Sequence, residues 1–346
     1  MHKHGGDVYG KADVIDYSAN INLRGIPEGI VQAALEGIKA SIHYPDVRCQ
    51  ELREAIAAEE GLPVDYIRCG NGAADVIFSL VLATKPKKAL MPAPTFYEYE
   101  QALRANGCDI TYHYLREEND FLFGEDFIDA LNSEYDIVFV CNPNNPSGGL
   151  CKPDYMKRVL AKCEECDILL VLDECFNDLL DEPEAYTMVS ELKNSKHLFI
   201  LKAFTKLYAM PGIRLGYGLC SDTDIFEKMR EVSQPWSVSI PAQKAGIAAL
   251  REKEYVKESK AEIKEEREFL LSNLHRLGIK TYGSHANYIF FKAWENLNVQ
   301  CEKNNVLIRD CSNYEGLSQG FFRIAVRRRN DNEKLIALFE KLMEEK

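Results

Sequence analysis

The chain has 346 residues, of which 46% are hydrophobic, and its 54 acidic against 42 basic side chains give a net charge of -12. This length predicts one large α/β domain with a smaller one, and the acidic balance argues against a general nucleic-acid or membrane-surface binding protein. Because there is no stretch of about 18 uncharged apolar residues and no apolar signal core near the N-terminus, we expect a cytoplasmic protein without membrane spans.

The eleven cysteines are scattered and odd in number, which is typical of reduced thiols in the cytosol. Cys163 and Cys166 form a lone C-x-x-C pair. Because no second pair lies nearby, we expect no metal site.

The first thirty residues are too short to fold alone and are expected to pack as an N-terminal arm (1–30) on the small domain. Over 31–255, a predicted large domain, short apolar runs alternate with longer amphipathic segments. The runs interpreted as buried strands are 87–94, 136–146, 167–174 and 197–206, and an example of the helical segments between them is 153–166. This alternation predicts βαβ units and a mostly parallel sheet covered by helices on both faces.

The last part of the chain, 256–346, has a different pattern. A charged helix begins near Lys257, three strand-like runs follow at 286–291, 306–311 and 321–326, and a helix ends the chain. This order predicts a smaller α+β domain.

Polar residues follow the apolar runs of the large domain, and ligands of open α/β sheets bind at the carboxyl ends of strands. Asn145, Asp173 and Lys206 are therefore candidate site residues, although each of them alone is better explained as a turn residue at a solvated strand end. A buried Asp173 would need a cationic partner. A buried Lys206 would have a lowered pKa and suit Schiff-base chemistry. The Pro211-Gly212 break would let the chain fold back and direct Arg214 at a phosphate near the lysine.

One ligand requires this whole set, namely pyridoxal phosphate, which needs an amine for its aldehyde, a carboxylate for its ring nitrogen and an anion site for its phosphate. The sequence also resembles the class I/II, fold-type-I pyridoxal-phosphate aminotransferases. The motifs that are similar to this family are CGNGAAD (69–75), NPNNPSGG (142–149), VLDECF (171–176), TKLYAMPGIRLGYG (205–218) and FRIAVR (322–327).

The resemblance implies a role for each matching residue. Lys206 would bond to the cofactor aldehyde, Asp173 would pair with the ring nitrogen, Asn145 would bond the ring hydroxyl, and Phe96 would stack on the ring. The cofactor phosphate would be held by Thr205 and Arg214 with the N–H groups of Gly72 and Ala73. Arg323 would bind the substrate α-carboxylate, and Tyr44 would reach the cofactor phosphate of a neighbouring subunit in a homodimer. Phe96 is also explained as core, and Tyr44 as a surface tyrosine. Ala203 stands where the family usually has a hydroxyl, Cys175 where alanine is usual, and Phe176 where many transaminases have tyrosine.

Two branches of the family are most similar, the histidinol-phosphate aminotransferases and the L-threonine-O-3-phosphate decarboxylases of cobalamin biosynthesis. The segments that are more similar to the decarboxylases include HGG (4–6), DYSANIN (16–22), QPWSVS (234–239), HANYIF (285–290) and LIRDCSNYEGL (307–317). The resemblance therefore implies a pyridoxal-phosphate-dependent lyase that converts a phosphorylated amino acid to aminopropanol phosphate, with transamination as the alternative.

Both candidate substrates are phosphorylated and need an anion pocket beyond that of the cofactor. Arg323 and Arg327 lie four residues apart and would face the same side of a strand. The further candidates for the substrate phosphate are His4, Asn22, Asn145 and Arg309, of which His4 is equally explained as an ordinary terminal histidine. A ligand sensor fused to a DNA-binding domain is disfavoured, because the fold begins within about twenty residues of the N-terminus and the chain is acidic.

Overall fold

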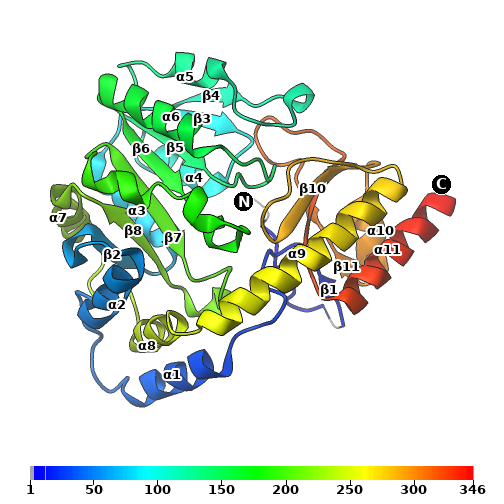
Figure 1. Cartoon of the computed structure of the whole chain (residues 1–346), viewed down its shortest axis with the longest axis horizontal. Coiled ribbons are helices and arrows are strands. Elements are labelled where there is room, and N and C mark those ends of the chain that lie inside the picture. The colour runs from blue at the N-terminus through cyan, green and yellow to red at the C-terminus, as the bar shows by residue number, and fades with distance from the viewer. Residues whose placement is uncertain (1–3, 12, 346) are drawn as a thin grey trace.

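The computed structural model describes residues 4–11 and 13–345, which form a seven-stranded sheet, a four-stranded sheet and a two-stranded pair, with helices packed around them (Figure 1). The helices are α1 (Glu28–Lys39), α2 (Gln50–Glu60), α3 (Ala73–Thr84), α4 (Tyr97–Ala105), α5 (Glu125–Ala130), α6 (Pro153–Glu165), α7 (Thr223–Val232), α8 (Ile240–Ala249), α9 (Lys253–Arg276), α10 (Leu297–Lys303) and α11 (Arg329–Glu344). The α/β fold predicted from the sequence is confirmed. The division at residues 30 and 255 stays a prediction, and α9 begins at Lys253.

The large sheet is mostly parallel, as the alternating pattern predicts. Its strands in spatial order are β2 (Ile67–Gly70), β8 (Gly216–Cys220), β7 (Leu198–Ala203), β6 (Leu169–Asp173), β5 (Ile137–Cys141), β3 (Lys88–Ala93) and β4 (Asp109–Tyr114). Strands β3 to β7 pair in parallel, whereas β8 runs antiparallel to both of its neighbours. The carboxyl ends of β5, β6 and β7 therefore meet at one edge of the sheet.

The central strands of this sheet are buried on both faces, which explains why β5 and β6 are continuous apolar runs. Phe139 on β5 packs in a core with residues of α3, α4 and α7. Its neighbours Val138 and Val140 point to the other face and pack in a core that includes residues of α2 and α6. Because successive strand residues face opposite sides, every position of such a strand must be apolar.

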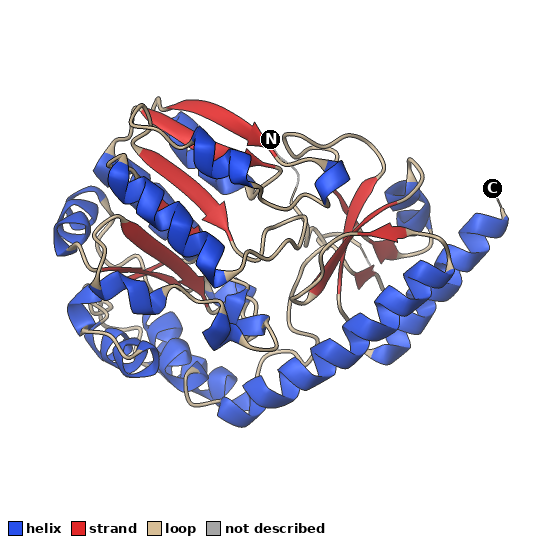
Figure 2. Ribbon diagram, turned by 45° about the horizontal axis from the view of Figure 1, so that its top comes forward, coloured by secondary structure: helices blue, strands red, loops and turns tan. Residues whose placement is uncertain are grey.

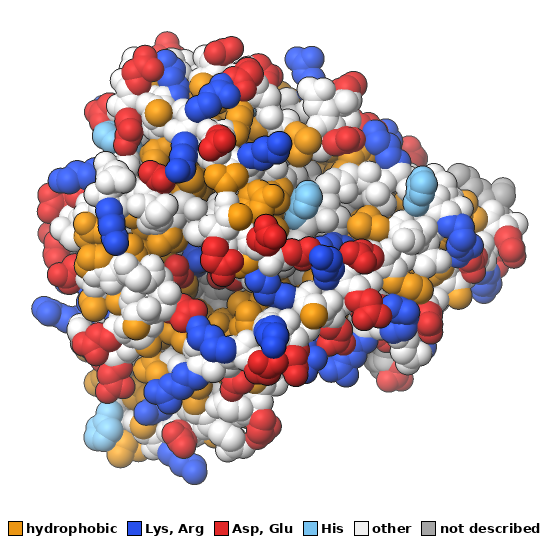
Figure 3. Space-filling view, in the orientation of Figure 1, with side chains coloured by type: hydrophobic (Ala, Val, Ile, Leu, Met, Phe, Trp, Pro, Cys, Tyr) orange, Lys and Arg blue, Asp and Glu red, His pale blue; other side chains and the backbone are white. Residues whose placement is uncertain are grey.

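The smaller sheet is antiparallel and consists of β12 (Arg309–Asp310), β13 (Phe321–Ala325), β10 (Tyr288–Lys292) and β9 (Lys280–Thr281). Helices α9 and α11 lie side by side along one of its faces (Figure 2), where Leu270 and Phe339 share a core with Phe291. Charged side chains of both signs are interspersed over the face in Figure 3. Among the described helices, none has the length and apolar character needed to cross a membrane.

The strand expected over 306–311 is in fact two short strands. β11 (Val306–Leu307) pairs in parallel with β1 (Ile15–Asp16) of the N-terminal segment, and after Ile308 the chain pairs with β13 instead. The change of partner ends one strand and starts another, and it brings the N-terminal segment beside the small sheet.

Candidate active site

A cavity of about 680 Å³ lies at the carboxyl ends of the central strands, between the large and small sheets. The predicted site residues that line it are His4, Ala73, Phe96, Asn145, Asp173, Thr205, Lys206, Arg214, Arg309 and Arg323. Residues far apart in the sequence meet here because the parallel strands end at one edge and the N-terminal segment and small sheet close over them. Ala203, Cys175 and Phe176, the three departures from the family pattern, line the cavity as well.

Asp173 is the last residue of β6 and is 4% exposed. Its Oδ1 accepts a hydrogen bond from the Cys175 N–H at 2.8 Å, and its Oδ2 accepts one from the Tyr99 hydroxyl. Burial raises the pKa of this carboxyl, whereas the donors on Cys175 and Tyr99 and the charge of Lys206 act to lower it. Two donors hold the carboxylate in one orientation, and a cationic N–H in the cavity would stabilise its ionised form.

Lys206 follows β7 by three residues and extends into the cavity, with its Nζ 5.7 Å from the ring centroid of Phe176. Burial, and then the positive charge of Arg323, lower the pKa of its amine to about 8. This direction agrees with the lowered pKa that the sequence predicts. A fraction of the amine is already uncharged near neutral pH, which is the form that reacts with an aldehyde.

Arg214 lies beside the start of α3 and lines the same cavity as Lys206. Its backbone is left-handed (φ 60°), and the short 3-10 turn Pro211–Ile213 precedes it. Gly72 (φ 82°) lies so close that a Cβ there would be 2.3 Å from Arg214 Nη2. Glycine is therefore required where the guanidinium meets the N-terminus of α3, an end of a helix that favours anions.

The two N–H groups expected to hold a phosphate differ in this conformation. The Gly72 N–H donates to the Gly70 carbonyl at 2.8 Å. Ala73 is the first residue of α3, where a backbone N–H has no acceptor within the helix. Of the two groups, Ala73 is the one oriented by the helix for an anion.

Arg309 and Arg323 are directly opposite each other on β12 and β13, and they are 5% and 6% exposed. Arg323 donates to Asn145 Oδ1 and, from Nη2, to the Ser18 carbonyl at 3.0 Å, and its buried Nε has no acceptor among the described residues. Arg309 Nη2 donates to Asn313 Oδ1 at 2.9 Å. Like charges directly across a sheet are destabilising, and burial adds to the cost, so this pair favours an anionic ligand in the cavity.

The structure corrects one expectation about the arginines. β13 ends at Ala325, so Arg327 lies beyond the strand and does not share a face with Arg323. Its Nε donates to Asp331 at 3.0 Å, its Nη1 donates to the Asp16 carbonyl at 3.1 Å, and it does not line the cavity. The buried arginine pair is Arg309 with Arg323.

Asn22 and Tyr44 also lie outside the cavity. Asn22 Nδ2 donates to the Leu207 carbonyl at 2.7 Å and its N–H donates to the Lys206 carbonyl at 3.2 Å, so it supports the loop that carries the lysine. Tyr44 is 78% exposed and its ring stacks on Trp236 with 4.6 Å between centroids.

Sequence reasoning missed several cavity residues. Asn20 is 1% exposed, and neither atom of its amide has a partner among the described residues. Glu98 adds a carboxylate to the cavity, and Tyr99, buried behind the cavity lining, orients Asp173 through its hydroxyl. Asn20 lies in the segment DYSANIN (16–22), and its place in a segment already singled out is the signal that could have pointed to it.

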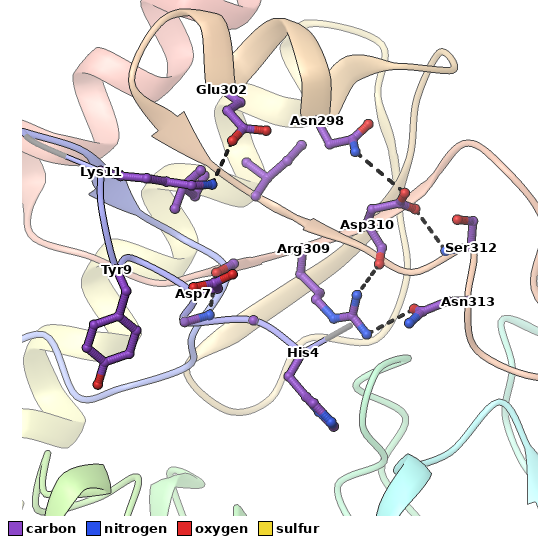
Figure 4. Close-up of a pocket in the computed structure, with 15 residues that line it drawn as sticks. His4, Asp7, Tyr9, Lys11, Asn298, Glu302, Arg309, Asp310, Ser312 and Asn313 are labelled. Atoms are coloured by element: carbon purple, nitrogen blue, oxygen red, sulfur yellow. Dashed lines mark hydrogen bonds and ion pairs between the residues drawn. The ribbon is translucent and has the colours of Figure 1, made fainter. Parts of the chain in front are cut away.

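A second cavity, of about 990 Å³, adjoins the first and lies between the N-terminal segment and the small sheet. Figure 4 shows Arg309 on the wall of this second cavity, hydrogen-bonded to Asn313. The His4 ring is directed away from Asn298 and Asp310. His4 and Arg309 border both cavities, so the N-terminal segment separates the proposed site from this outer space.

The fold and the arrangement of lysine, aspartate and arginine in one cavity define a protein with the architecture of fold-type-I pyridoxal-phosphate enzymes. Residues 12–339 match the family model for aminotransferase class I and II, and the chain belongs to this family. Threonine-phosphate decarboxylase of Salmonella typhimurium is 33% identical over 98% of this chain and 96% of its own length. Histidinol-phosphate aminotransferase of Methanosphaera stadtmanae is 28% identical over 97% and 93%. The crystal structure of histidinol-phosphate aminotransferase from Clostridium acetobutylicum superposes with a TM-score of 0.89 at 32% identity, covering 95% of this chain and 99% of that one.

Proposed function

We propose that this protein is a pyridoxal-phosphate-dependent decarboxylase and that its substrate is L-threonine O-3-phosphate. The observation that supports this best is the buried cross-strand pair Arg309 and Arg323, because a substrate with both a carboxylate and a phosphate offers one anion to each arginine. The decarboxylase from Salmonella, similar over nearly the whole chain, supports the same choice.

The side chains fit pyridoxal phosphate. Lys206 would hold its aldehyde, Asp173 its ring nitrogen, Asn145 its ring hydroxyl, and Thr205, Arg214 and Ala73 its phosphate. The Gly72 position supports the fit, since its φ of 82° is one that L side chains rarely adopt, and it places the backbone beside the Arg214 guanidinium at the anion end of the cavity. When bound, the cofactor supplies an electron sink that stabilises negative charge at the substrate Cα.

The chain's own residues determine which bond at Cα is broken. Arg323 is fixed by Asn145 and by the Ser18 carbonyl, so a carboxylate bound to its guanidinium would be held in one direction. Loss of CO2 leaves Cα in need of a proton. Lys206 Nζ, with a pKa of about 8, is largely protonated at pH 7 and is the nearby acid that can supply it.

The first test is an assay of the two reactions. Holoenzyme incubated with L-threonine O-phosphate is expected to release CO2 and form aminopropanol phosphate, measured by gas capture and mass spectrometry. With histidinol phosphate and 2-oxoglutarate we expect little glutamate. Glutamate formation in the second mixture with no CO2 in the first would replace the proposal by histidinol-phosphate aminotransferase, which the 32% identical Clostridium structure favours.

We further propose that two copies form a homodimer through the surface around α1. Large apolar side chains are exposed there, namely Leu35, Ile38, Ile42, Tyr44, Val47 and Trp236. Ile42 is 85% exposed. Such a cluster favours a protein partner, and a second copy of this chain would bring Tyr44 toward the other subunit's cofactor site, as the family resemblance implies.

The dimer is tested by analytical ultracentrifugation. The wild-type protein is expected to sediment at twice the 39.3 kDa of one chain. Ile42→Lys is expected to shift it toward the monomer, because it would bury a charge at the interface. Val299→Lys, at a 44% exposed apolar site on α10, is the control and should leave the dimer intact. A monomeric wild type, or a dimeric Ile42→Lys variant, would contradict this interface.

A further inference from the structure

Glu98 places a carboxylate in the cavity that the proposed cofactor and substrate contacts leave unused. It lies in the first turn of α4, two residues after Phe96, and lines the same cavity as Lys206, Arg309 and Arg323. Its Oε2 is buried and has no hydrogen-bond donor among the residues that the structure describes. A buried carboxylate oxygen without a donor is unfavourable unless the group binds a proton or a ligand supplies the missing bond.

Titratable groups face Glu98 from each element around it. His4 of the N-terminal segment approaches with its Nδ1 3.4 Å from Oε1. The charges of Lys206 and Arg309 favour the ionised carboxylate, that of Asp173 opposes it, and Tyr314 lies close enough to be affected by it. Burial outweighs the cations and raises the pKa of Glu98 to about 7, whereas burial and Arg309 lower the pKa of His4. Near neutral pH the proton therefore resides on the glutamate more than on the histidine.

An anionic substrate changes this balance. A phosphate bound at Arg309 and His4 would add negative charge to the cavity. It would also offset the positive charge of Arg309, which favours the ionised form of Glu98. A like charge nearby disfavours the ionised carboxylate. Either the substrate is repelled by Glu98 or a proton from solvent binds to the carboxylate as the substrate enters.

We propose that Glu98 takes up a proton when the substrate binds, and that the resulting neutral carboxylic acid donates a hydrogen bond to the anionic group of the substrate. The inference rests on the proposed function, in that the substrate is phosphorylated. The proton comes from solvent and joins Oε1 or Oε2, and no other bond is made or broken. Glu98 thus couples the binding of an anionic ligand to proton uptake, and this binding weakens as the pH rises.

The test measures proton uptake directly. Isothermal titration of holoenzyme at pH 8.0, in buffers of different ionisation enthalpy, gives the number of protons bound with each ligand. The probes are inorganic sulfate, which does not titrate in this range, and isopropyl phosphate, which has no amine to react with the cofactor and whose phosphate is fully ionised at this pH. We expect close to one proton per ligand, and an affinity that falls about tenfold per pH unit above pH 7.

Three variants identify the residue that takes up the proton. Glu98→Gln keeps the size of the side chain and a donor, so it should bind both probes without proton uptake and with little dependence on pH. Glu100→Gln removes a carboxylate that pairs with Arg104 on the same helix, and should behave as the wild type. His4→Gln should retain proton uptake.

Wild-type binding without proton uptake would overturn the inference, even if Glu98→Gln did not fold. Uptake that persists in Glu98→Gln and is lost in His4→Gln would overturn it in favour of the histidine. Absence of binding by both probes would also overturn it. If the proposed function is wrong but the inference about Glu98 is right, sulfate will bind with normal proton uptake while L-threonine O-phosphate releases no CO2.

Discussion

Replacing Lys206 by alanine is expected to abolish covalent retention of pyridoxal phosphate and to lower turnover by about 10²- to 10⁴-fold or more, the range for losing a positioned acid–base group. The amine lies in the cavity beside Asp173 and Arg323, and alanine has no nucleophile for the aldehyde. The measurement is mass spectrometry after incubation with pyridoxal phosphate and borohydride. The wild type should gain one reduced cofactor at residue 206, and the variant should gain none.

Lys202 is an internal control in the same experiment. It lies four residues earlier on β7 and is also buried, but its Nζ forms ion pairs with Glu60 and Asp178 at 3.1 Å. These carboxylates raise the pKa of Lys202, whereas burial without such partners lowers that of Lys206. A label on Lys202, or one retained by the alanine variant, would contradict the assignment.

The pH dependence follows from the lowered pKa of Lys206. Below about pH 8 the amine is mostly protonated, so the rate of aldehyde capture by apoenzyme should rise about tenfold per pH unit and level off above pH 8. Stopped-flow absorbance after addition of pyridoxal phosphate to the apoenzyme measures this rate. A rate that levels off only near pH 10, as for an exposed lysine, would show that the cavity does not perturb this amine.

Local sequence pattern predicted the parallel sheet and the groups at its edge for a physical reason. The run that ends at Asp173 is apolar up to that residue, and the run of β7 is apolar except for Lys202, because both faces of β6 and β7 are buried. A polar group directly after such a run lies at the carboxyl edge whatever the rest of the chain does. Asp173 could therefore be found without knowing the register of any strand, whereas Lys206 lies three residues beyond β7 and is distinguished from Lys202 by the motif TKLYAMPGIRLGYG.

The arginine pair could not be found in this way. Arg309 and Arg323 face each other because β12 and β13 pair in one register, and a shift of one residue would turn one of them away. That register joins segments distant in the sequence, as does the pairing of β1 with β11 just before Ile308, and no local pattern reports it. Glu98 was missed for a related reason, since a carboxylate in the first turn of α4 is equally typical of a solvated helix N-terminus.

Replacing Arg323 by glutamine is expected to raise the KM for L-threonine O-phosphate by about 30- to several thousand-fold, since losing one partner of a buried, hydrogen-bonded charge pair costs about 2–5 kcal/mol. Arg323 is 6% exposed and fixed by Asn145 and Ser18, with its Nε available to a ligand. Arg323→Lys should recover little of the loss, because an ammonium cannot bind a carboxylate through two parallel bonds.

Arg327→Gln is the matched control, four residues along the chain. Its guanidinium is 36% exposed and engaged by Asp331, and an exposed ion pair contributes at most about 1 kcal/mol, so KM should change by less than about fivefold. Initial rates of CO2 release, with thermal unfolding to confirm folding, measure all three variants. Equal losses for the glutamine variants at 323 and 327 would mean that the substrate carboxylate does not depend on the buried cross-strand pair. A large rise in KM for the variant at 323 alone would indicate that the pairing register of β12 and β13 determines which anion binds, more than the number of arginines in FRIAVR does.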